Sequence, residues 1–600
     1  MKKKRVIASL LSLATLAVFG LCGVAHAQWN TCGAALCTNP RDQYLPVAAS
    51  DGAGGTIIAW ADHRSSTATG TSRWLIYSQR LDNLGMPKWA IDGVKVAPDS
   101  AVADTLFDQE NPAIVADGSG GAYIAWVDKH RYPSTDIYLQ HIDSNGAPAW
   151  ATLDGGLAVT RAAHVQQNPT LVTDGAGGVI VVWQGSTGSS FDIYAQRVNP
   201  AGVLQWAGGL PTASVAVCAA RNSQFRPRAI PDGASGAIIV WYDERLVVGI
   251  SGGQDLFAQR LDGTGAPLWT LNGVPVFGTA TSSFAGDQRF PELISDGAGG
   301  AIITCESGSF TTDHGYEIAA QRLNTLGAQQ WTASGAIVCS ASFDQRYPNL
   351  TTDGSGGAII AWHDYRKGAN LDSDIYAQRV NASGVLQWAG GLPTGGVAVC
   401  TSIYNQSFPN VVTDGLGGAI IVWYDERGAT PNLFAQRLDP LGAAQWTAGG
   451  VGICGTPYGT YAHSTFADGV GGAIVAWQDG RSTNTDVYAA RVTFGGGLGA
   501  PAFALGVGDR RAGGLVLGAP SPNPTSRELS VQFVLPSAAP AVLELLDVTG
   551  RMVEHHEVGS LGPGVHVIRL GRAAALRAGL YFVRLRQNGA SLFAKASVIP

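Results

Sequence analysis

The fold is decided by the stretch Asp353-Gly354-Ser355-Gly356-Gly357-Ala358-Ile359-Ile360-Ala361-Trp362, because variants of it recur eight times in a chain of 600 residues. Asp-Gly between two short apolar runs predicts a β-hairpin, since glycine readily adopts the positive φ that the turn requires. Nine residues separate the Asp from the Trp position in every copy, and Cys305 takes that position in the fifth copy. The hairpins begin at Asp51, Asp117, Asp174, Asp232, Asp296, Asp353, Asp414 and Asp468.

Two further runs follow each hairpin, which predicts units of four short strands. In the sixth copy the third run spans residues 374–380 and the fourth carries Trp388. The third-strand aromatic position and the fourth-strand Trp are twelve residues apart in all seven complete copies. The connection from strand two to strand three varies from 11 to 17 residues, and the connection between units from 17 to 23. In an antiparallel meander the two variable connections lie on one edge, here called the variable edge, opposite the fixed edge.

The ends of the repeat region predict that the array closes on itself. The eighth unit lacks a Trp-bearing fourth strand after residues 486–492, whereas Gln28-Trp29-Asn30-Thr31-Cys32-Gly33-Ala34-Ala35-Leu36-Cys37 aligns with the fourth strand at residues 330–339. A ring needs such a piece, and pairing both chain ends in one sheet removes an exposed edge. We therefore predict an all-β chain with an eight-bladed β-propeller over residues 28–494, closed by an N-terminal strand. It resembles the wider β-propeller class without WD or kelch motifs. An open solenoid is the alternative.

Composition and the N-terminus predict an exported globular protein. Apolar residues make up 46% of the chain and charged residues 14%, against about 25% in average proteins, so a packed core is expected. The net charge of −6 disfavours nucleic acid as a partner. Four cations at residues 2–5, an apolar run over 6–24 and Ala25-His26-Ala27 predict a signal peptide over residues 1–27. We expect no transmembrane segment in the mature chain, because no other stretch approaches 18 apolar residues.

Residues that recur in every unit are predicted to be architectural, because a single active site needs only one copy of each group. Fifteen of the sixteen tryptophans fall at two repeated positions and are expected to pack between units. The glutamines of Gln-x-x-Pro and of strand three are expected to be buried amides bound to loop backbone. Cysteines such as Cys37 recur at one position and are expected to be small buried hydrophobes, with a local Cys32–Cys37 disulfide left open.

Trp-x-Asp followed by Arg occurs six times, for example with Asp62 and Arg64 and with Asp128 and Arg131. Structural ion pairs are the favoured interpretation, and a ring of charge that binds an extended polymer is the alternative. No cofactor or metal is expected. A hairpin offers one carboxylate per turn, whereas calcium takes six to eight oxygen ligands, and no zinc spacing occurs.

Function is expected at the variable edge, because loops on a rigid frame carry binding residues. The fifth copy, near Pro291, breaks the pattern most, and two charged residues follow the strand-one prolines of neighbouring copies; they either face a ligand or pair with each other. The irregular tryptophan either stacks on a sugar or covers a loop. The candidate ligand-binding residues are Trp74, Arg228, Glu292, Glu306, Asp313 and His314.

The expected partner is an extracellular glycan or protein. No catalytic residue is identified, because no Gly-x-Ser-x-Gly elbow, phosphate loop or His-Glu-x-x-His occurs. Acids such as Glu292 and Glu306 leave a polysaccharide hydrolase or lyase as the alternative, and a purely structural surface protein as another.

The last part of the chain predicts a separate module. Residues 495–517 are rich in Gly and Ala and are expected to be a linker, and residues 518–600 are expected to form a small β-sandwich. This segment resembles the C-terminal sorting domains of bacterial type IX secretion and the related immunoglobulin-like modules of flagellar hook-capping proteins. The resemblance implies contact with the secretion machinery and a secreted or outer-surface location in a Gram-negative bacterium; a merely stabilising sandwich is the alternative. Its motifs are Pro522-Asn523-Pro524, Asp547-Val548-Thr549-Gly550-Arg551, Gly562-Pro563-Gly564-Val565-His566, Ala578-Gly579-Leu580-Tyr581-Phe582 and Lys595-Ala596-Ser597-Val598-Ile599.

Overall fold

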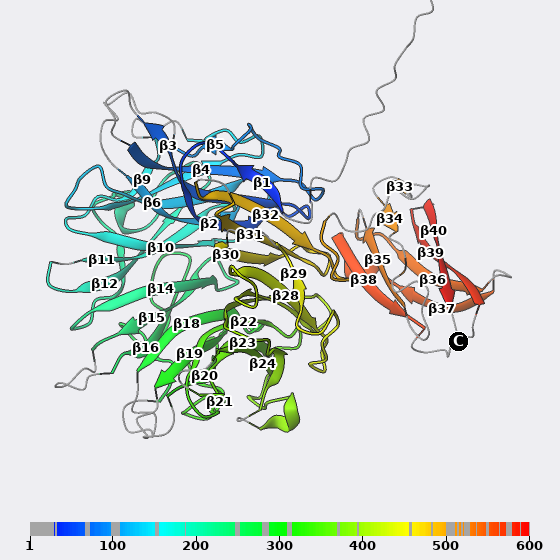
Figure 1. Ribbon diagram of the computed structural model, residues 1–600. Coiled ribbons are helices and arrows are strands. Elements are labelled where there is room, and N and C mark those ends of the chain that lie inside the picture. Colours follow the sequence, from blue (N-terminus) through cyan, green and yellow to red (C-terminus); the bar gives the residue numbers. More distant parts are fainter. Residues whose placement is uncertain are drawn as a thin grey trace, which may run out of the picture.

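The computed structural model describes a ring of sheets and a smaller module, coloured along the chain in Figure 1. It describes residues 29, 33–66, 72–97, 108–150, 155–186, 188–245, 253–278, 287–308, 315–368, 372–392, 395–454, 459–481, 484–499, 511–512, 515–517, 520, 529–535, 537–547, 551–562, 564–571, 576, 579–588 and 590–598. The predicted signal peptide, Cys32, Asp313 and His314 lie outside the described residues.

Eight four-stranded antiparallel sheets form the blades of an eight-bladed β-propeller, as predicted. Blade 1 contains β2 (Gln43–Ser50), β3 (Thr56–Ser66), β4 (Ser72–Leu81) and β5 (Val94–Lys95). Blade 2 contains β6 (Gln109–Ala116), β7 (Ala122–Asp128), β8 (Asp136–Ile142) and β9 (Leu157–Thr160). Blade 3 contains β10 (Gln166–Thr173), β11 (Val179–Ser186), β12 (Phe191–Val198) and β13 (Val215–Cys218). Blade 4 contains β14 (Gln224–Pro231), β15 (Ala237–Asp243), β16 (Asp255–Leu261) and β17 (Val274–Pro275).

The other four blades repeat this order. Blade 5 contains β18 (Gln288–Ser295), β19 (Ala301–Gly308), β20 (Tyr316–Leu323) and β21 (Ala336–Cys339). Blade 6 contains β22 (Gln345–Thr352), β23 (Ala358–Asp364), β24 (Asp374–Val380) and β25 (Val397–Cys400). Blade 7 contains β26 (Gln406–Thr413), β27 (Ala419–Asp425), β28 (Asn432–Leu438) and β29 (Val451–Gly452). Blade 8 contains β30 (Thr460–Ala467), β31 (Ala473–Asp479) and β32 (Asp486–Val492), and takes its fourth strand, β1 (Ala34–Cys37), from the N-terminus.

The ring closes where β1 pairs with β32, with Ala34 opposite Ala489 and Ala35 opposite Tyr488. The two chain ends therefore share one sheet, and the blue β1 lies beside the amber β32 in Figure 1. This confirms the closure predicted from the N-terminal sequence and removes the free edges that an open array would expose.

Tryptophans fill the spaces between blades. Trp60 is fully buried, and Trp89 is 7% exposed and donates its indole N–H to the Ser144 carbonyl of the next blade at 3.1 Å. Gly146 (φ 85°) packs on the face of Trp89, and a Cβ there would lie 2.6 Å from the indole ring. Both its conformation and this contact require glycine, so the fixed edge combines a tight turn with close contact between blades.

At each hairpin the turn Asp binds a basic side chain of strand three, an Arg in seven blades and His141 in blade 2; we call this contact the clasp. In blade 6, one oxygen of Asp353 accepts the backbone N–H groups of Ser355 and Gly357, and the other binds Arg379 of strand three at 3.0 Å. Arg379 also donates to the Pro440 carbonyl of blade 7 at 3.1 Å, so the clasp links neighbouring blades. The pairs are Asp51–Arg80, Asp117–His141, Asp174–Arg197, Asp232–Arg260, Asp296–Arg322, Asp353–Arg379, Asp414–Arg437 and Asp468–Arg491.

The Trp-x-Asp motif forms ion pairs inside the blades, with one correction. Asp62 is fully buried and accepts bonds from the Trp60 indole at 2.8 Å and from Arg64 at 2.6 Å, and Arg64 covers the ring of Tyr77 at 3.8 Å. A ring of exposed charge is therefore not what these residues form.

The predicted pair of Asp128 with Arg131 is wrong. Asp128 binds His130 at 2.6 Å, and Arg131 lies 3.4 Å from Asp136. The side chain that binds the Asp of Trp-x-Asp belongs to the residue two positions later, as with His130 after Asp128 and Arg64 after Asp62. The backbone N–H of that residue also donates to the same carboxylate.

The repeated glutamines and cysteines lie where the sequence predicted. Gln345 is fully buried and donates to three loop carbonyls, and Gln378 bonds the backbone around Trp388. Cys37 is a buried free thiol, and burial raises its pKa to about 12. Such a thiol is a weak nucleophile at neutral pH.

The C-terminal module is a β-sandwich. One sheet contains β33 (Arg511–Ala512), β34 (Leu515–Leu517), β35 (Leu529–Leu535) and β38 (Gly564–Leu570). The other contains β37 (Met552–Glu557), β36 (Ala541–Asp547), β39 (Gly579–Gln587) and β40 (Ala590–Val598). Side chains from both sheets, including Phe533 and Leu585, form one core. Three short 3-10 helices complete the described elements: η1 (Ala207–Gly209), η2 (Ala389–Gly391) and η3 (Gly559–Leu561).

The segment expected to be a linker over 495–517 is structured at both ends. Leu498 pairs with Val492 and packs against the core of the last blades, and Leu515 and Leu517 belong to the sandwich core. The apolar side chains at these positions explain the difference, because a Gly/Ala-rich average hides single buried leucines. No helix in the described part of the chain has the length and hydropathy needed to cross a membrane.

Candidate functional site

The innermost strand of every blade carries a bulge near the variable edge. The residue two positions after its first residue has a positive φ, as at Tyr347 (φ 51°), and the pairing register shifts there. These residues lie one per blade around the axis, and we call them the mouth ring. The mouth ring comprises Leu45, Asn111, Asn168, Arg226, Phe290, Tyr347, Phe408 and Ala462.

A hydrogen bond across the blade interface, here called the latch, holds five members of the mouth ring. The acceptor is the middle residue of Trp-x-Asp, or its equivalent, in the preceding blade. Glu306 accepts the Tyr347 N–H at 2.6 Å, and His363 Nδ1 accepts the Phe408 N–H at 3.5 Å. The other three latches join Gln184 to Arg226, Tyr242 to Phe290 and Gln478 to Leu45.

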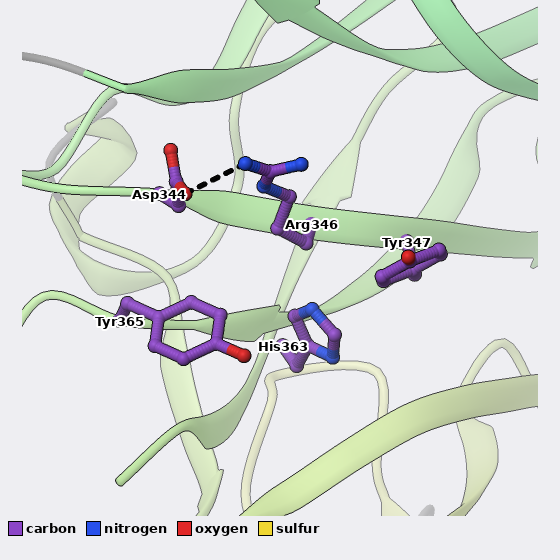
Figure 2. Close-up of a pocket in the computed structure, with 5 residues that line it drawn as sticks. All are labelled: Asp344, Arg346, Tyr347, His363 and Tyr365. Carbon is purple, nitrogen blue, oxygen red and sulfur yellow. Dashed lines mark hydrogen bonds and ion pairs between the residues drawn. The ribbon is translucent and has the colours of Figure 1, made fainter. Parts of the chain in front are cut away.

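Blade 6 contains a cavity of about 300 Å³ at this level, lined by Asp344, Arg346, Tyr347, His363 and Tyr365. Figure 2 shows Asp344, Arg346 and Tyr347 along one strand and His363 and Tyr365 along its neighbour. Arg346 binds Asp344 at 2.8 Å, and the ring centroids of Tyr347 and His363 are 4.9 Å apart. The volume is at the lower end of the roughly 300–1,000 Å³ typical of small-ligand sites.

His363 forms a buried wall of this cavity. The side chain is 2% exposed, and burial lowers the pKa of His363 to about 3, so the ring is neutral. Because Nδ1 accepts the Phe408 N–H, the proton of the neutral ring is on Nε2. His363 Nε2 has no hydrogen-bond partner among the described residues. This atom is buried as well as unpaired, an uncommon state for a polar group, and His363 contributes to the cavity as a buried wall.

Glu306 lies behind the cavity wall and supports it. Its carboxyl is fully buried, and desolvation raises its pKa to about 7. One oxygen makes the latch to Tyr347, and the other lies 3.8 Å from Arg346 without a hydrogen bond. Glu306 therefore holds two cavity residues in place from blade 5 and has no surface of its own to offer a ligand.

The other sequence candidates lie apart from the cavity. Arg228 and Glu292 form an ion pair of 3.2 Å between the inner strands of blades 4 and 5. Trp74 in blade 1 stacks on His63 with 4.4 Å between ring centroids, and its backbone N–H donates to Asp108.

None of the five cavity-lining residues was a sequence candidate. Most of the sequence candidates belong to the blade that breaks the repeat pattern or to its neighbour, whereas the cavity lies in blade 6, whose Trp-x-Asp motif is regular. Tyr347 occupies the mouth-ring position and His363 the middle of Trp-x-Asp, and the other three lining residues lie within three positions of these two in the sequence. A comparison of the eight copies at these two positions would have drawn attention to Tyr347 and His363, but not to the space between the strands. No group of three or more Asp, Glu, His or Cys side chains in the described ranges is placed to hold a metal ion.

No protein-family model and no curated protein matches the chain. Among solved structures, it is similar to a protein of unknown function from Dyadobacter fermentans, with a TM-score of 0.34, 8% identity and coverage of 54% of this chain and 94% of that one. It is also similar to a levansucrase variant from B. megaterium (TM-score 0.27, 11% identity, 46% and 84%). A third is an alpha-L-arabinofuranosidase from Lactobacillus brevis (TM-score 0.27, 8% identity, 49% and 94%). At these TM-scores none of the likenesses bears on function.

Proposed function

We propose that this protein is an exported β-propeller that binds an extracellular glycan, with one sugar unit in the blade 6 cavity. The observation that carries the proposal is a cavity whose walls combine three aromatic rings with the Asp344–Arg346 ion pair. A sugar ring offers apolar C–H faces to Tyr347 and Tyr365, and its hydroxyl groups can donate to Asp344 and accept from Arg346. Such a mixture of aromatic surface with a few placed polar groups is typical of small-ligand sites.

Binding is favoured over hydrolysis by the state of the two acids considered for catalysis. Glu292 is paired with Arg228, and Glu306 is fully buried. A glycosidase needs two carboxyl groups flanking an accessible bond. Export at the N-terminus and sorting through the C-terminal sandwich complete the proposal; removing residues 518–600 is expected to leave the protein in the periplasm, as cell fractionation and immunoblotting would show.

Titration calorimetry of the purified protein against a panel of neutral and acidic oligosaccharides tests the binding. Tyr365→Ala is expected to weaken the best ligand at least tenfold, because it removes one wall of the cavity without breaking a latch. Glu426→Ala is the matched control, since Glu426 follows the Trp-x-Asp of blade 7 as Tyr365 follows that of blade 6. Equal affinity of Tyr365→Ala and the parent, or no oligosaccharide bound at all, contradicts the proposal.

A further inference from the structure

Three of the eight mouth-ring residues form an aromatic arc. Phe290, Tyr347 and Phe408 come from three successive blades, with ring centroids 4.6 Å and 4.8 Å apart. Phe408 is 46% exposed. Tyr347 also lines the cavity, so the arc and the cavity form one continuous surface.

A cation stands at the end of the arc. Arg226 is exposed, and it is the mouth-ring neighbour of Phe290 on the adjacent inner strand. Its backbone N–H donates to Gln184 at 2.7 Å, and this latch fixes the backbone without using the guanidinium. Arg226 has no ion-pair partner among the described residues, whereas Arg228, Arg289 and Arg346 each have one. In a chain with a net charge of −6, this is an uncompensated positive charge at the mouth.

The backbone indicates that these side chains are retained for a purpose. All eight mouth-ring residues have a positive φ, a conformation that glycine adopts without strain. The chain uses glycine at its hairpin turns, where φ is also positive, yet none of the eight mouth-ring residues is glycine. Non-glycine residues are strained at a positive φ, so their presence at all eight positions points to a role for the mouth-ring side chains.

Between them, the mouth ring and the cavity offer a carboxylate one unpaired guanidinium among the described residues, that of Arg226, because Arg346 in the cavity is paired with Asp344. The aromatic arc continues from Arg226 to the cavity. Guanidinium groups bind carboxylates with strong charge-assisted hydrogen bonds. A chain of sugars that presents a carboxylate to Arg226 and ring faces to the arc complements this arrangement.

We infer that the mouth ring and the cavity together bind an acidic polysaccharide built from uronic acids, with a carboxylate at Arg226 and sugar rings on Phe290, Tyr347 and Phe408. The inference rests on the proposed glycan binding and adds the class of glycan. It assigns Arg226 the choice between acidic and neutral chains, and it assigns the arc the contact with the sugar rings.

The test compares ligands that differ in charge alone. Calorimetry would measure binding to hexasaccharides of galacturonic, mannuronic and glucuronic acid, each beside its methyl ester, at two salt concentrations. At least one acid is expected to bind ten times more tightly than its ester, with an affinity that falls as salt rises. Arg226→Gln is expected to remove that preference and leave ester binding unchanged. Arg221→Gln, an equal change of charge at an exposed arginine of the same blade outside the mouth ring, is expected to change neither.

The outcomes separate the two proposals. Equal binding of acid and ester, or binding of neutral oligosaccharides alone, overturns the acidic class and leaves glycan binding standing. Failure to bind any saccharide overturns both. An Arg226→Gln protein that keeps the preference for the acid overturns the assignment to the mouth ring, and a Phe408→Ala protein of unchanged affinity overturns the role of the arc.

Discussion

Neighbouring blades are joined by different side-chain interactions at the two edges of the propeller. At the fixed edge the clasp uses an Asp in all eight blades, with Arg as partner in seven and His141 in blade 2. At the variable edge the latch makes the same backbone bond with Gln184, Tyr242, Glu306 or His363. The clasp Asp accepts two turn N–H groups with one oxygen and binds a basic side chain with the other, so both oxygens of the carboxylate are used. The latch needs only one acceptor that is long enough to reach the neighbouring blade, so different residue types can make it. These different side chains give the variable edge of each blade its own chemistry.

The largest effect is expected where the clasp is broken. Asp468 and Arg491 are each 1% exposed and lie 2.6 Å apart. Asp468→Ala would leave a buried guanidinium without its partner and is expected to destabilise the protein by about 3–5 kcal/mol. The thermal midpoint measures this loss. Lys88→Ala, which breaks a mostly exposed pair of 3.8 Å with Asp82, is the control and is expected to change stability by less than about 1 kcal/mol. Similar midpoints for the two variants would remove the distinction between buried and exposed pairs.

Much of this comparison was within reach of the sequence. Repeated Asp-Gly hairpins and the N-terminal Trp29 predicted the blades and the closure, because both follow from local periodicity and counting. The clasp was missed although Arg379 directly follows the strand-three Gln in the same way as its counterparts, because its partner lies 26 residues earlier. The cavity was out of reach, since it depends on which side chains of neighbouring strands leave space between them.

Acid is expected to destabilise the protein through His363, which makes the latch from blade 6 to Phe408. The folded pKa of His363, about 3, lies below its ordinary value of 6.5, so the unfolded chain takes up the proton first. Stability is therefore present above pH 6.5 and lost as the pH falls, by about 3 kcal/mol at pH 4. His363→Gln keeps an acceptor, as Gln184 does in blade 3, and removes the titration. We expect it to match the parent at pH 7.5 and to have the higher thermal midpoint at pH 4.5. If the thermal midpoints of both proteins fall equally between pH 7.5 and pH 4.5, groups other than His363 cause the loss of stability in acid.

Glu306 is expected to lower the stability of the protein at high pH, the opposite of the pH dependence expected for His363. Its folded pKa of about 7 exceeds the ordinary 4.5, so its contribution is complete below pH 4.5 and is lost as the pH rises through 7. The loss is about 3 kcal/mol at pH 8. Glu306→Gln stays neutral and still accepts the Tyr347 N–H. It is expected to unfold at a higher temperature than the parent at pH 8 and at nearly the same temperature at pH 4.5. A parent protein that is the more stable of the two at pH 8 would mean that Arg346 compensates the buried charge.

The smallest effect concerns whether latch residues are interchangeable. Gln478 is 5% exposed and accepts the Leu45 N–H across the junction of blades 8 and 1 at 3.3 Å. Gln478→Ala leaves that N–H without its partner and is expected to cost about 1 kcal/mol. Gln478→His introduces the acceptor that blade 6 uses and should recover most of that loss at pH 7.5. It should also acquire a decline in stability below pH 6, because a buried imidazole resists protonation. If the His variant is no better than the Ala variant at pH 7.5, the latch depends on the side chain and not only on an acceptor. Fewer residue types could then make the latch than the comparison with the clasp implies.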